Sequence, residues 1–223
     1  MLKNLNITES EIKSNVTVWV TMHSDGTKMD GIQSISTAVT CNRFCAARRA
    51  NGESVCAKCY AETLCKMRKK LREHITDNSR ILNERLLTED ECRKIRIVTR
   101  IARIESFGDV TSVLQARNYI RIIRAIPNTQ FGIWSKNWNF WKQAFKIEGK
   151  PNNCTFVLSS LRLNEPAKIP KSMRDYIDHV FTVYDPKHYV YENTPQGCAG
   201  IQCRSCLKCY RKDTPFFIAE KLR

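Results

Sequence analysis

The sequence has no long apolar run. No stretch approaches the roughly 20 residues that a membrane-spanning helix requires, and the first residues have no apolar stretch typical of a secretory signal peptide. It also has no internal repeat, low-complexity tract or obvious linker. These absences predict a cytoplasmic protein with no membrane partner.

Cysteine is too scarce for a disulfide scaffold. Eleven cysteines in 223 residues are roughly 5%, below the level of about 8–10% that marks such scaffolds in short secreted chains. The content of 42% hydrophobic and 26% charged residues excludes wholesale disorder. In a reducing cytosol, clustered cysteines more often bind metal than pair with each other.

Eight of the eleven cysteines fall into two groups. The second group has successive gaps of two residues, as in ferredoxin-like loops that wrap one iron–sulfur cluster. Zinc is the alternative there, although structural zinc sites usually pair two short knuckles across a longer loop. Isolated Cys65, Cys92 and Cys154 are expected to be buried and to behave as small hydrophobes. The first group is Cys41, Cys45, Cys56 and Cys59; the second is Cys198, Cys203, Cys206 and Cys209.

The first group is less regular, because ten residues separate Cys45 from Cys56. The CxxC pair that ends it is followed by Tyr60, which resembles the end of a radical-SAM cluster loop. If three cysteines bind a 4Fe–4S cluster, one iron stays open for a ligand. If all four bind, the centre is closed and is structural or transfers electrons. One or two clusters are therefore expected.

Strand and helix patterns alternate along the chain. Alternating or β-branched runs predict strands, and apolar residues three and four apart predict helices. Ser112 and Gln115 form a capping box that opens a helix stopped by Pro127. The predicted strands are 16–20, 95–104, 130–134, 155–161 and 180–183, a short extended stretch covers 32–40, and the helices are one long helix from about 61, one from 112 and one over 139–146.

This alternation predicts an α/β protein with a mainly parallel sheet. Five or six strands are too few for a complete eight-stranded barrel. We expect a partial (β/α) barrel, radical-SAM-like, with cysteine-rich loops at one end of the sheet. Residues 1–190 would form the α/β domain with the first cysteine group, and 191–223 a cysteine-rich extension packed on it as part of a single globular unit.

The order of motifs resembles the phage "gene product 88" family, which looks radical-SAM-like in fold. The similarity covers roughly residues 33 to 210 and implies iron–sulfur binding; a phage-encoded chain would work in the host cytosol. Asn42, Glu105 and Phe107 depart from the family's usual Pro, His and Ser. The matching segments are Thr40-Cys41, Cys59-Tyr60-Ala61, Arg103 to Asp109, Phe131 to Lys136, Val157 to Arg162, and Cys203 to Tyr210.

Polar residues at the predicted strand ends are the candidates for chemistry, because parallel strands present their active groups at their carboxyl ends. Asp109 could orient an amine or act as a base, while Lys136 and Arg162 could hold a carboxylate or phosphate. A helix cap or a surface ion pair is the alternative for each. The catalytic candidates are Glu105, Asp109, Lys136 and Arg162; the cofactor-binding candidates are Tyr60, Ser106, Gly108, Ser135 and Ser159.

The charge favours a polyanionic partner. A formal net charge of +15 indicates nucleic acid above all. The aromatic residues Trp138, Trp141 and Phe145 could stack on bases, but their spacing of three and four favours packing in the core.

Two functions are therefore predicted. The first is an enzyme that uses an open-iron 4Fe–4S cluster on a nucleotide, a nucleic acid or a small sulfur-containing substrate, by reductive cleavage of S-adenosylmethionine or by Lewis-acid chemistry. The alternative is a nucleic-acid-binding module whose four-cysteine sites hold iron–sulfur or zinc as structural groups.

Overall fold

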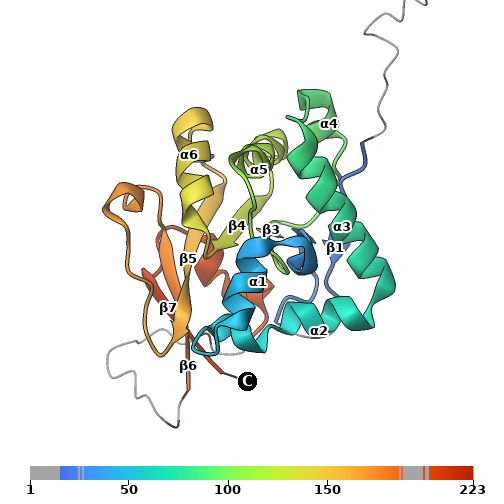
Figure 1. Ribbon diagram of the computed structural model, residues 1–223. Coiled ribbons are helices and arrows are strands. Elements are labelled where there is room, and N and C mark those ends of the chain that lie inside the picture. The colour runs from blue at the N-terminus through green and yellow to red at the C-terminus, as the bar shows by residue number, and fades with distance from the viewer. Residues whose placement is uncertain are drawn as a thin grey trace, which may run out of the picture.

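A seven-stranded sheet forms the centre of the computed structural model, which describes residues 16–24, 26, 28–185, 187, 198 and 201–222 (Figure 1). Each strand lies beside its predecessor, and every pairing is parallel except that of β1 with β2. The strands are β1 (Thr21–Met22), β2 (Gln33–Ile35), β3 (Ile101–Ile104), β4 (Gln130–Ser135), β5 (Cys154–Leu163), β6 (His179–Tyr184) and β7 (Phe217–Lys221).

Helices connect the strands. Figure 1 shows α3, α5 and α6 side by side in one layer, while α1 and α2 lie at one end of the molecule. The helices are η1 (Val39–Cys41), α1 (Arg43–Ala50), η2 (Val55–Lys58), α2 (Tyr60–Met67), α3 (Lys69–Glu84), α4 (Glu89–Arg93), α5 (Val113–Ala125), α6 (Trp138–Glu148), η3 (Lys171–Met173), α7 (Cys203–Cys206) and η4 (Lys208–Tyr210).

The main core lies between the sheet and the helix layer. Alternate strand residues such as Ile104, Ile133 and Phe156 face this core and pack with Tyr119 of α5 and Trp141 of α6. Burial of such side chains is the main source of stability, at about 1.5–3 kcal/mol for each large residue. Trp141 and Phe145 are buried and Trp138 is partly buried against the same core, so the prediction of core packing over base stacking is confirmed.

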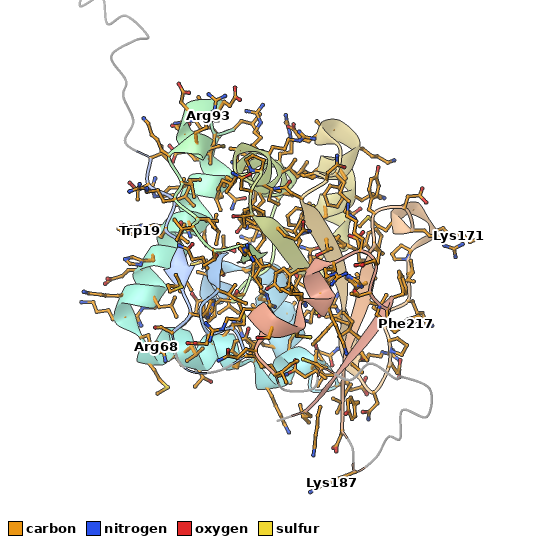
Figure 2. All side chains as sticks on the ribbon, turned by 180° about the vertical axis from the view of Figure 1, so that it is seen from behind. Trp19, Arg68, Arg93, Lys171, Lys187 and Phe217 are labelled. Atoms are coloured by element: carbon orange, nitrogen blue, oxygen red, sulfur yellow. The ribbon has the colours of Figure 1, made fainter. Side chains whose placement is uncertain are left out.

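The C-terminal segment covers part of the opposite face. Ile101, Trp134 and Val157 pack there with Tyr210, whose ring meets that of Trp134 edge-on at 5.5 Å. Figure 2, seen from behind, shows this segment in front of the strands. The described residues of the predicted extension also supply β7, which pairs with β6. The predicted boundary between 190 and 191 lies outside the described residues.

The prediction of an α/β protein with a mainly parallel sheet is confirmed, with seven strands rather than five or six. The sheet is not closed into a barrel, since β1 and β7 form its two edges in the described chain. Among the described residues no helix has the length and apolar character needed to cross a membrane.

Several predicted elements were wrong. Residues 16–20 form no strand, because the backbone of Trp19 bonds the Asn78 side chain at both its N–H and its carbonyl, at 2.8 and 2.9 Å. The long helix from 61 is broken at Arg68, whose backbone is extended. The strand predicted over 95–104 is confined to β3. The predicted N-cap is confirmed, since the Ser112 hydroxyl accepts from the N–H of Gln115.

Candidate metal centres

Capping side chains shape the loop that carries the first cysteine group. The Asn42 side chain caps α1 by accepting from the N–H of Cys45 at 3.2 Å. The Ser54 hydroxyl caps η2 by accepting from the N–H of Cys56 at 3.1 Å. Asn and Ser are preferred at such positions because their side chains satisfy free helix N–H groups. Cys59 directly precedes α2.

This loop is docked on the carboxyl ends of the strands. Ser54 forms an isolated antiparallel bridge with Arg162 of β5. The Asn42 amide donates to the carbonyl of Asp109, which follows β3, at 2.6 Å. The first group therefore lies where the sequence analysis predicted it, at the end of the sheet from which the strand-end residues project.

The thiols of this group differ in exposure. Cys41 is exposed, while Cys45, Cys56 and Cys59 are partly buried. Burial raises the pKa of the Cys45 thiol, with further contributions from the negative charges of Asp109 and Glu105 and from the other two thiols.

A residue in the left-handed backbone conformation shapes the loop of the second cysteine group. Cys203 and Cys206 bound the single turn of α7, and Leu207 then takes a φ of 57°, which reverses the chain into η4 and Cys209. The Thr155 hydroxyl of β5 donates to the Cys209 carbonyl at 2.6 Å. This group therefore lies against the face of the sheet opposite the main helix layer, so the expectation that the cysteine-rich loops lie at one end of the sheet was wrong for the second group.

Cations lie beside the second group. The Lys28 ammonium donates to the sulfur of Cys198 at 3.2 Å and also pairs with Glu220. These two partners raise the pKa of Lys28 against the lowering effect of its partial burial. Burial raises the pKa of Cys203, and the positive charge of Arg103 acts against this rise.

Arg103 is a partly buried cation for which the described residues offer no carboxylate partner. Its guanidinium stacks on Trp134 at 4.2 Å from the ring centre, and its buried Nε has no hydrogen-bond partner. A buried donor without an acceptor is costly, so the chemistry of this side chain fits an anionic group at the second cysteine group. The sequence analysis assigned no role to Arg103, although the alternation of β3 puts it on the same face as Ile101.

The buried carboxylate of Glu105 turns away from that face. Its φ of 59° breaks the strand alternation, and its oxygens accept from Tyr119 and Gln115 of α5 and twice from Thr37, at 2.7 to 3.0 Å. Desolvation raises the pKa of Glu105 to about 7 in spite of these four donors. The side chain links the end of β3 to the helix layer, and its predicted catalytic role stays a prediction.

Asp109 joins the ends of β3 and β4. Its carboxylate accepts from the Ser135 hydroxyl at 2.6 Å and from the N–H groups of Val110, Lys136 and Asn137 at 2.7 to 3.2 Å. Burial raises its pKa, and the bond from Ser135 lowers it. Asp109 and Ser135 therefore link the end of β3 to the segment before α6, and the predicted roles of both residues stay predictions.

The remaining strand-end candidates line a small cavity of about 250 Å³. The Lys136 ammonium reaches the Ser159 hydroxyl at 3.4 Å. Arg162 is exposed and pairs with Glu165 at 3.3 Å. The cavity is also lined by Lys168 and by the carboxylate of Glu165, and the carboxylate- or phosphate-holding role of Lys136 and Arg162 stays a prediction.

Tyr60 and Ser106 are joined by a hydrogen bond, and Gly108 packs against Thr37. The Tyr60 hydroxyl donates to the Ser106 carbonyl at 2.5 Å. The Ser106 hydroxyl is buried and has no partner. Gly108 is required by close approach, because a Cβ there would lie 2.6 Å from the Thr37 carbonyl oxygen.

No three Cys, His, Asp or Glu side chains in the described part of the chain converge so as to hold one metal ion. The isolated Cys65, Cys92 and Cys154 are buried, as predicted.

The profile of the family described as Gene product 88 matches residues 7–212. No curated protein and no solved structure matches the chain.

Proposed function

The chain belongs to the gene product 88 family, a phage gene product family, and from this and its cysteine geometry we propose that it is a radical-SAM-like iron–sulfur enzyme. The first cysteine group would hold a 4Fe–4S cluster with an open iron, and the second would hold a closed one. The observation that carries the proposal is the pair of cations at the second group, Arg103 and Lys28.

A thiolate-ligated cluster would supply the negative charge that Arg103 lacks. Arg103 has a buried Nε without an acceptor and no carboxylate partner among the described residues. Lys28 already donates to the sulfur of Cys198. Hydrogen bonds and charges around the sulfurs are the means by which proteins stabilise such clusters and set their potentials.

The spacing of the thiols supports a cluster over zinc. Structural zinc sites usually pair two short knuckles across a longer loop, whereas Cys203, Cys206 and Cys209 follow one another at successive gaps of two residues. A four-iron cluster takes one thiolate on each iron and so spreads its ligands more widely. Zinc at the second group remains the competing assignment that the experiment below decides.

The first group supports an enzyme because one of its thiols is accessible. Cys41 is exposed and lines a cavity of about 730 Å³. A 4Fe–4S centre with one open iron supplies an electron to S-adenosylmethionine or acts as a Lewis acid. Glu105 and Asp109 would set the field at Cys45, and Lys136 and Arg162 would hold an anionic part of the substrate.

A nucleic-acid-binding module is the second candidate, supported by the distribution of charge. Figure 2 shows Arg68 and Lys187 at the same end of the molecule, with Arg93 at the other. The exposed cations Lys66 and Lys69 also lie on α2 and α3 at the end of Arg68. A polyanion bound across this end would pass the first cysteine group.

Anaerobic purification followed by electron paramagnetic resonance separates these candidates. We expect Cys206→Ser and Cys41→Ser each to remove one cluster signal, whereas Cys154→Ala, at a buried isolated cysteine, leaves both. S-adenosylmethionine or a substrate should change only the signal that Cys41→Ser removes. Two signals that no small molecule alters would favour the binding module, and a colourless zinc protein would refute the iron–sulfur proposal.

A further inference from the structure

The larger cavity lies between three helices at the carboxyl end of the sheet. Its volume is about 730 Å³, within the range of small-molecule and cofactor sites. The first residues of α1, one face of α3 and the first turn of α6 form its walls. Among the lining residues are Cys41, Arg43, Phe44, Thr76, Arg80 and Phe140.

The charged side chains that line this cavity are all positive. Two guanidinium groups, those of Arg43 and Arg80, line it, and no carboxylate does. Arg43 has no ion pair within the described chain. Arg80 pairs with Glu84 at 3.1 Å, but both side chains are more than 60% exposed, so little free energy is lost when an anion replaces that partner.

The walls also offer aromatic surface. Phe44 and Phe140 line the same cavity as the two arginines. Phenyl rings accept stacked bases, and guanidinium groups bind phosphate through paired hydrogen bonds. A ligand that joins an aromatic ring to a phosphate satisfies both features at once.

We propose that this cavity binds a nucleotide, with its phosphate at Arg43 and Arg80 and its base against the phenyl rings. Cys41 would then lie beside the bound nucleotide. The inference names the substrate class of the proposed function, and it rests on that function for any reaction. A free mononucleotide and a nucleotide within a single strand share this chemistry.

Isothermal titration calorimetry of the full chain tests the inference. The probes are the four ribonucleoside monophosphates, their nucleosides, inorganic phosphate and a single-stranded oligonucleotide. We expect at least one monophosphate to bind about tenfold more tightly than its nucleoside or phosphate alone. An oligonucleotide that binds more tightly, with the same dependence on Arg80, identifies the strand as the source. No binding by any nucleotide would overturn the inference.

Matched variants locate the site. Arg80→Gln should weaken binding about tenfold, whereas Arg93→Gln should not, although Arg93 is also exposed and paired with a glutamate four residues away on α4. Thr76→Glu, which adds a carboxylate to the cavity, should weaken binding more than Asn152→Glu at an exposed loop position. Equal effects within either pair would show nonspecific charge attraction and overturn the assignment.

The outcome is separable from that of the proposed function. Titrations with iron-free chain measure the cavity alone. Nucleotide binding to a chain that never holds iron supports the cavity and refutes the iron–sulfur enzyme. Iron and sulfide in a chain that binds no nucleotide refute the cavity assignment and leave the enzyme proposal standing.

Discussion

The guanidinium of Arg103 lies over the ring of Trp134, 4.2 Å from its centre, with its buried Nε unbonded. The contact fixes a positive charge on the sheet face where the second cysteine group packs. Stacking on an aromatic ring partly compensates a cation for lost water, but it does not supply the missing acceptor. An anionic centre at the cysteines would.

Arg103→Leu should therefore affect the metal-loaded and metal-free chains differently. In the metal-free chain we expect the free energy of unfolding to change by less than about 1 kcal/mol, because the lost cation–π contact and the relieved buried donor offset each other. In the loaded chain we expect iron loss about tenfold faster, as for other residues that support metal ligands. Chelator challenge measures the rate, with the exposed Arg100→Leu as control. Equal rates for the two variants would contradict the role of Arg103.

Gly108→Ala tests the packing of the segment after β3 against Thr37. The added Cβ would lie 2.6 Å and 2.8 Å from the carbonyl and hydroxyl oxygens of Thr37. We expect a loss of about 1–3 kcal/mol in the free energy of unfolding, because backbone must move to admit the methyl group. Gly52→Ala is the matched control, since nothing lies within 4 Å of its Cβ position. Urea unfolding measures both, and an unchanged midpoint for Gly108→Ala would refute the close approach.

The fold was predictable where one pattern dominated. The apolar residues of β4, β5 and β6 are buried on both faces of the sheet, the helical spacing around Trp141 reflects burial on one side of α6, and these elements were found. The edges were not. β1 is two residues long, and β7 carries the exposed Phe217 beside the buried Ile218 and Ala219, so neither gives a clear local signal.

The residue types of the site could be predicted from the sequence, but the directions of their side chains could not. The expected fold placed the cysteine-rich loops at one end of the sheet, which holds for the first group and not for the second, and the motif Glu105 to Asp109 marked the end of β3. The left-handed backbone of Glu105 depends on its four tertiary donors, which no local pattern encodes. Arg103 was noted only as the first residue of the matching segment Arg103 to Asp109, because its stacking on Trp134 and its unpartnered Nε depend on tertiary contacts.

Glu105 predicts a pH dependence of stability. Its pKa rises from 4.5 to about 7 on folding, so the folded chain binds the proton more tightly than the unfolded chain. The contribution of Glu105 to the free energy of unfolding is fully present below pH 4.5 and is lost as the pH rises through 7. This contribution is about 3 kcal/mol in total. Glu105→Gln should remove this slope, while Asp109, Cys45 and Tyr119 nearby titrate in both proteins and largely cancel. Parallel curves of unfolding free energy against pH would contradict the assignment.

Asp109→Asn should lower the free energy of unfolding markedly, although the two side chains are almost the same size. The Asp109 carboxylate accepts four hydrogen bonds, three of them from backbone N–H groups. An amide has one oxygen and one –NH₂ group, so its –NH₂ would face at least one backbone N–H that then has no acceptor. We expect a loss of about 2 kcal/mol or more. Ser135→Ala removes one of the four donors and should cost about 1 kcal/mol. Thermal unfolding compares them, and a smaller effect for Asp109→Asn than for Ser135→Ala would refute the joining role.

The central claim is that both cysteine groups hold iron–sulfur clusters. Counting iron, acid-labile sulfide and zinc per chain after anaerobic purification tests it most directly. The account predicts about eight iron atoms and eight sulfides per chain, four of each at each group, with little zinc. One or two zinc ions with no sulfide would contradict it.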